Sequence, residues 1–180
     1  MRTILTLHPD SRCAAVSAIE VEAVRREAGM LSLRYLVSGQ MDHVILPPPA
    51  EPVRTDELWR HTCLEAFVGA PDEAPYAEIN LAPSGQWAAY GFEDYRQGMA
   101  PLEPFEPPAV VTSFTDRGVD VSATLRLGSL VGLPWRLGLS AVIEEVGGQI
   151  SYWALAHPAA RPDFHHRDGF ALDLPWTGRP

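Results

Sequence analysis

The sequence predicts an all-β protein in which antiparallel strands form a sandwich or a barrel. Three observations lead to this fold class. Short segments of alternating apolar and polar residues recur along the chain, glycine and proline separate them, and no long segment has the apolar period of an amphipathic helix. The chain has 180 residues, of which 46% are hydrophobic, and this is enough for one well-filled core. We therefore expect a single domain over residues 1–180.

The first part of the chain predicts three strands. Thr3–His8 is a candidate first strand, and Val16–Arg26 and Leu31–Val37 flank a hairpin-like break at residues 27–30. Leu31–Val37 alternates cleanly between apolar and polar side chains. Val16–Arg26 is rich in alanine and glutamate, so that a helix remains an alternative for this segment.

Proline punctuates the remainder of the chain. Residues 47–54 contain four prolines, which excludes a helix or a central strand there, and Thr55–Leu58 then predicts a capped helical turn. Gln97–Pro108 has four prolines and no periodicity, and is expected to be a surface loop. The later elements are expected to be a hairpin of Val110–Phe114 with Val119–Leu127, a helical turn at Gly128–Leu133, a hairpin of Arg136–Glu145 with Gln149–Ala156, and a last strand at Phe170–Leu174.

Residues 57–96 predict three consecutive strands with one apolar and one polar face. Successive side chains of a strand point to opposite sides, so that alternation sets the two faces. We expect Tyr90 in the apolar core, together with Leu64, Ile79, Leu81 and Val121. The apolar face is predicted to hold Leu64, Ala66, Val68, Ala77, Ile79, Leu81, Ala88, Tyr90 and Phe92, and the other face His61, Cys63, Glu65, Phe67, Tyr76, Glu78, Asn80, Trp87, Ala89 and Gly91.

The connections predict how these three strands pair. A hairpin closed by Ala70–Pro75 would set Glu65 opposite Asn80 and Phe67 opposite Glu78. A two-residue turn at Ser84-Gly85 would set Ala82 opposite Trp87, Asn80 opposite Ala89 and Glu78 opposite Gly91.

This arrangement predicts a ligand-binding trough on the polar face. Glu65, Glu78 and Asn80 would lie together beside Ala89 and Gly91, whose small side chains leave space above the sheet. Trp59, His61, Tyr76 and Trp87 would stand at the margin, and the flat rings of Trp87 and Trp59 could stack on a cyclic ligand. The other three tryptophans, Trp135, Trp153 and Trp176, are equally suited to core packing. Alternatively, the three polar residues could only hydrogen-bond the backbone of a loop such as Gln97–Pro108.

Composition excludes several function classes. All 14 basic residues are arginine, the formal net charge is −9, and no lysine is available for Schiff-base or P-loop chemistry. An acidic chain with no basic run is a poor partner for nucleic acid or an anionic membrane. There is no apolar segment of signal-peptide or membrane-spanning length. We therefore expect a cytoplasmic protein in which Cys13 and Cys63 are reduced.

Two catalytic alternatives rest on particular residues. Glu65 and Glu78 could form the acid/base pair of a glycoside hydrolase, although two glutamates on one sheet face often serve only to bind. Asp163, His165, His166 and Asp168 carry metal-ligating side chains, but their spacing matches no zinc motif. We therefore expect hydrogen-bonded loop residues there and predict no metal site.

Three segments resemble the bacterial DOMON-like proteins, which are related to DOMON domains and family-nine carbohydrate-binding modules. These segments are LWRHTCLEAFV, YAEINLAPSGQWAAYGFEDYRQGM and SYWALAHPAARPDFHHRDGF, within a stretch from about Trp59 to Leu172. The resemblance implies a β-sandwich of jelly-roll type whose concave face binds sugars or haem. The residues that match the family pattern best are Trp59, Glu65, Glu78, Asn80, Ser84 and Trp87. Haem-binding relatives use a methionine and a histidine as axial ligands, for which Met99 and His61 are the candidates here.

The sequence thus favours a non-catalytic module that binds a small ligand, with a carbohydrate or polyol as the first candidate and no cofactor predicted. A haem-binding module is the first alternative, and a glycoside hydrolase that uses Glu65 and Glu78 is the second. The predicted ligand-binding residues are Trp59, His61, Glu65, Glu78, Asn80 and Trp87.

Overall fold

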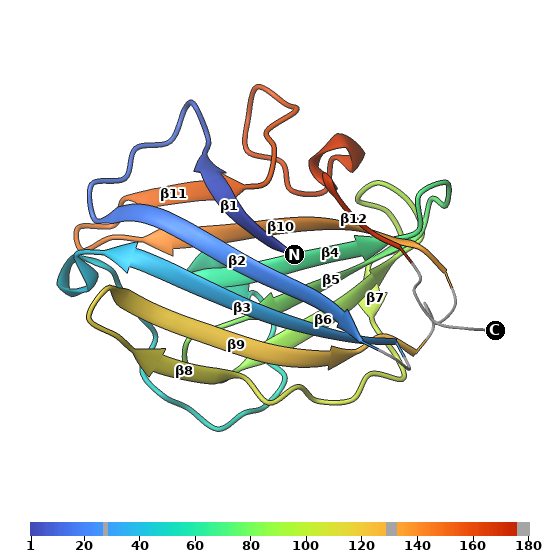
Figure 1. The fold of residues 1–180 in the computed structure, drawn as a ribbon, viewed down its shortest axis with the longest axis horizontal. Coiled ribbons are helices and arrows are strands. Elements are labelled where there is room, and N and C mark those ends of the chain that lie inside the picture. Colours follow the sequence, from blue (N-terminus) through green and yellow to red (C-terminus); the bar gives the residue numbers. More distant parts are fainter. Residues whose placement is uncertain (27–28, 129–132, 176–180) are drawn as a thin grey trace.

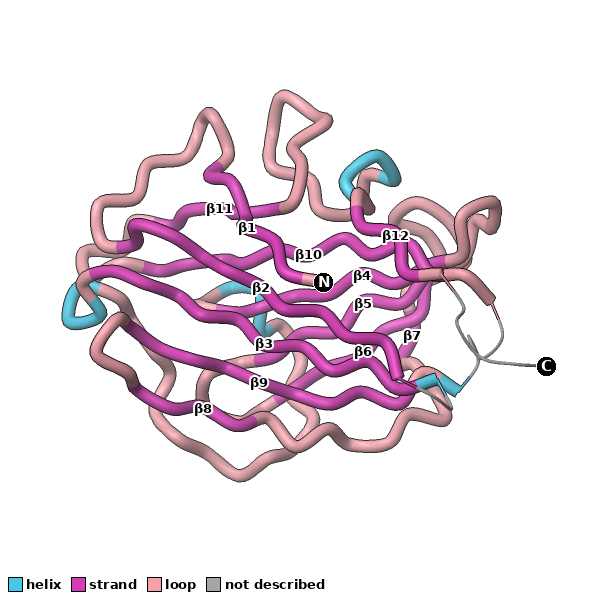
Figure 2. Tube along the Cα trace, viewed as in Figure 1, coloured by secondary structure: helices cyan, strands magenta, loops and turns pink. Residues whose placement is uncertain are grey.

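A computed structural model describes residues 1–26, 29–128 and 133–175. This part of the chain is all-β, and its helical segments are single 3-10 turns (Figure 2). None of its helices is long and apolar enough to cross a membrane. The strands are β1 (Arg2–Leu7), β2 (Val16–Arg26), β3 (Met30–Gly39), β4 (Cys63–Gly69), β5 (Tyr76–Leu81), β6 (Trp87–Phe92), β7 (Ala100–Pro101), β8 (Val111–Phe114), β9 (Gly118–Arg126), β10 (Trp135–Glu144), β11 (Ile150–Ala154) and β12 (Leu172–Leu174), and the 3-10 turns are η2 (Met41–His43), η3 (Leu58–Arg60) and η5 (Arg167–Gly169).

The strands form one curled antiparallel sheet that folds over itself into a sandwich (Figure 1). Its order is β7-β6-β5-β4-β10-β11-β1-β2-β3-β9-β8, and β12 pairs with β10. β1 joins the two layers, because Arg2–Leu5 pairs with β2 whereas Thr6 and Leu7 pair with β11. The predicted antiparallel sandwich is confirmed.

The core lies between the two layers and is filled from both. Ile19 and Leu33 enter it from the β2–β3 layer, and Leu64 and Ile79 enter it from the β4–β5 layer. Burying one such side chain stabilises the fold by roughly 1.5–3 kcal/mol. Of the core residues predicted from sequence, this cluster contains Leu64, Ile79, Leu81 and Val121. The prediction for Tyr90 is wrong, because Tyr90 belongs to a second aromatic cluster on the outer face of its layer.

Several predicted elements have the expected form. Val16–Arg26 is a strand, so the helical alternative is wrong there, and its alternate residues Ile19, Val21 and Ala23 are buried in the core. The helical turn expected at 55–58 lies slightly later, at η3. Most of the turn expected at Gly128–Leu133, and Trp176, lie outside the described residues.

The β5–β6 register differs by one residue from the prediction. Leu81, rather than Ala82, lies opposite Trp87, and Glu78 lies opposite Tyr90. The cause is a three-residue loop, in which the Ala82 amide donates to the Gln86 carbonyl at 2.9 Å and Gly85 has a φ of 98°. A slip of one residue exchanges the two faces of a strand. Trp87 and Ala89 therefore face the core between the layers. Ala88, Tyr90 and Phe92 lie on the opposite face of the strand, where they are buried in the second aromatic cluster.

Candidate ligand-binding site

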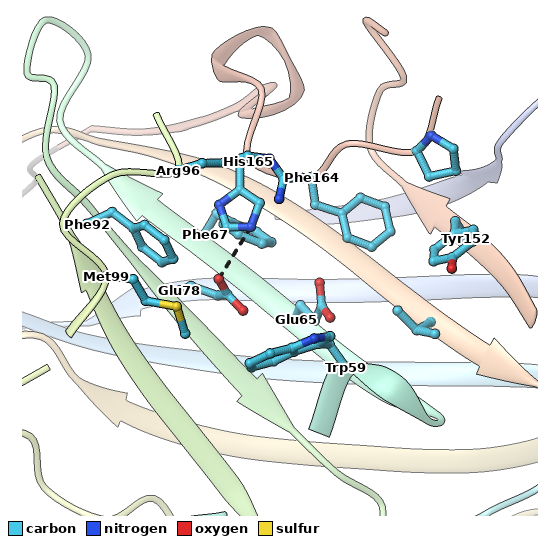
Figure 3. Close-up of a pocket in the computed structure, with 12 residues that line it drawn as sticks. Trp59, Glu65, Phe67, Glu78, Phe92, Arg96, Met99, Tyr152, Phe164 and His165 are labelled. Atoms are coloured by element: carbon cyan, nitrogen blue, oxygen red, sulfur yellow. Dashed lines mark ion pairs between the residues drawn. The ribbon is translucent and has the colours of Figure 1, made fainter. Parts of the chain in front are cut away.

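A cavity of about 360 Å³ lies on the outer face of the β4–β5–β6–β10 layer (Figure 3). Strand side chains form its floor, and η3, the loop after β6 and the loop before η5 supply its walls. The lining residues are Trp59, Glu65, Phe67, Glu78, Phe92, Arg96, Met99, Val142, Tyr152, Pro162, Phe164 and His165.

Two glutamates of neighbouring strands form the polar part of the floor. Glu65 lies opposite Asn80, and Phe67 lies opposite Glu78, which confirms the predicted β4–β5 register. Both carboxylates point into the space between Trp59 and His165 (Figure 3). Glu65 is 2% exposed, Glu78 is 5% exposed and Asn80 is fully buried. Each carboxylate therefore faces the cavity from a largely desolvated position.

Each glutamate uses one oxygen to bond the protein. The Ser140 hydroxyl, from the facing position on β10, donates to Glu65 Oε2 at 3.1 Å. The Asn80 side-chain amide donates to Glu78 Oε1 at 2.7 Å. Glu65 Oε1 and Glu78 Oε2 accept no hydrogen bond from any described residue. These two oxygens are the free acceptors of the site.

The environment raises the pKa of both carboxyl groups. For Glu65, burial raises the pKa well above its ordinary value, and the nearby negative charge of Glu78 raises it further. For Glu78, burial again raises the pKa, while the Asn80 hydrogen bond and the Arg96 charge act in the opposite direction. The two acids consequently hold protons to a higher pH than exposed glutamates do.

His165 closes the cavity opposite the two acids. Burial and the charge of Arg96 lower its pKa to about 4, so that the ring is neutral at neutral pH. The Arg96 backbone amide donates to the Tyr76 hydroxyl oxygen at 3.2 Å, and Nδ1 of His165 lies 2.8 Å from that same oxygen. We assign the Tyr76 hydroxyl as the donor to Nδ1, which leaves the ring proton on Nε2, 3.7 Å from Glu78 Oε2.

Arg96 is held at the wall by an acidic partner. Its Nη2 donates to Asp163 Oδ1 at 2.8 Å, and the Tyr95 hydroxyl donates to the other oxygen of Asp163 at 2.5 Å. The Arg96 and Tyr95 hydrogen bonds lower the pKa of Asp163 despite its partial burial. Asp163 therefore stays ionised and balances the guanidinium charge.

Aromatic rings make the remaining walls. Trp59 packs edge-on against Tyr90, with ring centroids 5.7 Å apart. Phe92 stacks on Tyr76 at 4.8 Å, with an angle of 2° between the rings. On the opposite side, Phe164 packs edge-on against Tyr152, with ring centroids 6.1 Å apart. The cavity thus combines a carboxylate floor with flat apolar sides.

The structure brings together some of the predicted site residues and separates others. Trp59, Glu65 and Glu78 line the cavity, and Asn80 lies beneath it, bonded to Glu78. His61 does not line the cavity: its side chain is 65% exposed and lies 2.7 Å from the carboxylate of Glu144. Trp87 does not reach the cavity either, since it faces the core and contacts Phe105.

The hydrogen-bond partners of Glu65 and Glu78 also bear on the alternative in which these residues only bond the backbone of a loop. Glu65 and Glu78 bond side chains of neighbouring strand positions rather than the backbone of residues 97–108. That loop instead donates the Leu102 amide to the Ala89 carbonyl at 3.0 Å, and Leu102 packs against the core. The loop does not brace the carboxylates.

Sequence reasoning missed most of the wall residues, among them Phe92, Arg96 and Phe164. Phe92 would have been found with the correct β5–β6 register, because it shares a face with Glu78. Arg96 and Phe164 come from irregular segments, where no periodicity predicts the direction of a side chain.

The polar residues between Asp163 and Asp168 have two different structural roles. His165 lines the cavity, and Asp163 binds Arg96 at its wall. The His166 ring instead caps η5, accepting from the Asp168 amide at 3.2 Å. No group of three or more His, Cys, Asp or Glu side chains within the described residues is placed to hold a metal ion.

The two candidate axial ligands of haem, Met99 and His61, do not lie together at the cavity. Met99 and His165 both line it, but Nδ1 of His165 is engaged by the Tyr76 hydroxyl, and Nε2 faces Glu78 Oε2 at 3.7 Å. Buried carboxylates in the floor also differ from the apolar slot that a porphyrin requires. His61, the other candidate axial ligand, lies outside the cavity.

The fold resembles that of a protein linked to carbohydrate binding. Comparison with protein-family models finds no match, and comparison with the curated proteins finds none either. Among solved structures, the fold is similar to the crystal structure of a candidate carbohydrate-binding protein from Bacteroides uniformis, with a TM-score of 0.65. The similarity covers 93% of this chain and 83% of that chain at 11% sequence identity. It shows a shared sandwich architecture.

Proposed function

We propose that this protein is a non-catalytic binding module for a small hydroxylated ligand, a carbohydrate or related polyol, held in the cavity of the β4–β5–β6–β10 layer. One observation carries the proposal. Two buried carboxylates each turn a free oxygen into a cavity that is walled by Trp59, Phe92 and Phe164.

The chemistry of sugars matches this arrangement. A pyranose has hydroxyl donors around its rim and apolar C–H patches on its faces. Glu65 Oε1 and Glu78 Oε2 can accept from hydroxyls, while the Trp59 ring can cover a C–H face. The volume of about 360 Å³ lies near the lower end of the range for small-molecule sites, which suits a ligand of one or two rings.

The shared fold with the Bacteroides uniformis protein supports a binding role. A relation to the DOMON and family-nine modules belongs to the same proposal, and it rests on the sequence resemblance. Because a partly open site of this kind exchanges water hydrogen bonds for protein hydrogen bonds, we expect affinities of roughly micromolar to millimolar.

The hydrolase alternative uses the same two carboxyl groups. A retaining glycosidase needs one carboxyl group kept protonated and one kept ionised, so the environments of its two acids must push their pKa values apart. Burial raises the pKa of both Glu65 and Glu78, and the rise is larger for Glu65. Turnover of a chromogenic glycoside that is lost in Glu78→Gln would favour this alternative over binding.

Calorimetric titration with a panel of mono- and disaccharides tests the proposal. At least one sugar should bind, and its binding should shift the amide NMR signals of Glu65, Glu78 and Asn80. If no sugar binds at tens of millimolar, well above the weakest affinity expected, the binding function is wrong.

A further inference from the structure

We infer that the ligand carries a protonated nitrogen, as an amino sugar or other small hydroxylated amine does, and that this ammonium group sits between Glu65 and Glu78. The inference rests on the proposed function and specifies the chemical class of its ligand. It follows from the charges, the free acceptors and the aromatic walls of the cavity.

The first argument is the charge of the cavity. Three carboxylates and one guanidinium face it or support its wall. The guanidinium of Arg96 is committed to Asp163, at 2.8 Å, and His165 is neutral at neutral pH because its pKa lies near 4. Glu65 and Glu78 thus have no cationic partner of their own among the described residues. Buried carboxylates are ordinarily paired with a positive charge.

The free acceptors form the second argument. Glu65 and Glu78 come from adjacent strands, and their carboxylates point into the same space (Figure 3). An ammonium group has three donors and no acceptor, so it can satisfy both oxygens at once while neutralising charge. A hydroxyl group donates only one hydrogen bond, and because it is uncharged it cannot neutralise a carboxylate. A cationic nitrogen therefore matches this pair of oxygens better than a hydroxyl does.

The third argument is the ring of aromatic faces. Trp59 lies on one side of the carboxylates, with Phe92 and Phe164 on the others (Figure 3). Cations are attracted to aromatic faces, most strongly to tryptophan, and the attraction grows as the site is desolvated. The walls that would cover the C–H groups of a neutral sugar thus add attraction for an ammonium group.

Binding of such a cation is coupled to proton release. Without a cation, burial raises the pKa of both acids, and the charge of Glu78 raises the pKa of Glu65 further. The other titratable groups packed around the pair are Tyr35, Cys63, Tyr76, Arg96 and His165. A bound ammonium favours the ionised carboxylates and expels the proton. Its affinity should consequently rise with pH until the amine of the ligand itself loses its proton.

Isothermal titration at pH 6 with glucosamine, glucose and N-acetylglucosamine tests the inference on the unmodified protein. The three ligands share a ring and differ in the charge at one position. We expect glucosamine to bind at least tenfold more tightly than the other two. Repeating the glucosamine titration in buffers with different ionisation enthalpies should reveal net proton release.

Matched variants locate the effect. Glu78→Gln and Glu65→Gln should each reduce the preference for glucosamine several-fold, whereas Glu144→Gln, which alters an acid outside the cavity that pairs with His61, should leave it unchanged. Thermal unfolding checks that each variant is folded. If one variant does not fold, the other variant and the proton-release measurement still decide.

The outcomes separate this inference from the proposed function. Equal or tighter binding of the neutral sugars, or a preference for glucosamine that survives in both Glu65→Gln and Glu78→Gln, overturns the cationic ligand and leaves carbohydrate binding intact. Failure of every neutral and cationic sugar to bind overturns both.

Discussion

The hydroxyl oxygen of Tyr76 lies 2.8 Å from Nδ1 of His165 and accepts a hydrogen bond from the Arg96 amide. One side chain of β5 thereby positions both the loop after β6 and the loop before η5. These are the loops that supply the cavity walls opposite Trp59. The shape of the site therefore depends on a single phenol group.

Tyr76→Phe should weaken ligand binding while the protein remains folded. The substitution leaves His165 Nδ1 and the Arg96 amide without their shared partner, which should lower the free energy of unfolding by roughly 1–2 kcal/mol. Tyr90→Phe is the matched control, because it removes a hydroxyl bonded to Asp56 at 2.7 Å but keeps the ring against Trp59. Comparable loss of affinity in both variants would show that the Tyr76 hydroxyl has no special role at the site.

Trp59→Ala should reduce the affinity for the best-binding sugar by about 1–3 kcal/mol, since it removes the ring that would stack on the ligand. Trp87→Phe is the control, because Trp87 faces the core rather than the cavity. We expect this control to keep its affinity and to lose only a little stability. Calorimetric titration of the two variants distinguishes them, and a larger effect of Trp87→Phe would place the ligand elsewhere.

Gly138→Ala should destabilise the fold by about 1–3 kcal/mol. Gly138 lies opposite Phe67, and an added Cβ would come within 2.9 Å of the Phe170 ring. Phe170 packs against Phe67 and Tyr76 beneath the cavity, so that ligand affinity should also fall.

Gly91→Ala provides the comparison for that steric effect. It is also a strand glycine, but an added Cβ there would meet only Leu102 Cδ1, at an ordinary contact distance of 3.6 Å. Urea unfolding of both variants should show a clear loss of stability for Gly138→Ala alone. Equal stabilities would mean that the Phe170 ring moves freely.

Glu65→Gln should stabilise the protein, and the gain should grow with pH. In the folded state the pKa of Glu65 is raised by burial and by Glu78, so the folded protein binds more protons than the unfolded chain above about pH 4.3. The free energy of unfolding of the wild type must then fall as the pH rises through this window.

Because a glutamine does not titrate, we expect a gain on the order of 1 kcal/mol near pH 8 and a smaller gain at pH 5. Thermal unfolding at both values measures it. A gain that was larger at pH 5 would contradict the raised pKa of Glu65.

The two cysteines should differ in reactivity. Both are free thiols, but Cys63 is fully buried, and burial together with Glu65 raises its pKa well above the ordinary value, whereas Cys13 is half-buried. An aromatic disulfide reagent should therefore count one thiol in the native protein and two after denaturation. Rapid reaction of two thiols in the native state would show that the site face opens readily.

Sequence alternation predicted one half of the site floor and failed for the other half. Glu65, Glu78 and Asn80 share a face because β4 and β5 alternate clearly between apolar and polar residues. On β6 both faces carry aromatic and small residues, Trp87 and Ala89 against Ala88 and Tyr90. Hydrophobicity alone does not distinguish these faces, so the prediction depended on the turn. The additional residue in the loop then reversed it.

Sequence periodicity could not predict where the side chains of the loops lie. The positions of Arg96 and His165 follow from their tertiary partners, Asp163 and Tyr76. These pairs join residues that are 67 and 89 positions apart in the chain. The sheet, its core and the acidic floor could thus be predicted from local patterns, whereas the walls could not.

The two pairings of β1 set the order in which the protein can assemble during translation. Its first four residues pair with β2, which follows soon in the chain, but the Thr6 hydroxyl donates to the Ala154 carbonyl, 148 residues later. Such a distant contact forms slowly, because a long loop must close first. While the ribosome is still synthesising β10 and β11, the Thr6–Leu7 end of β1 therefore has an unpaired edge. The edge is closed only when β11 becomes available, so the sandwich is completed last at the junction between its two layers.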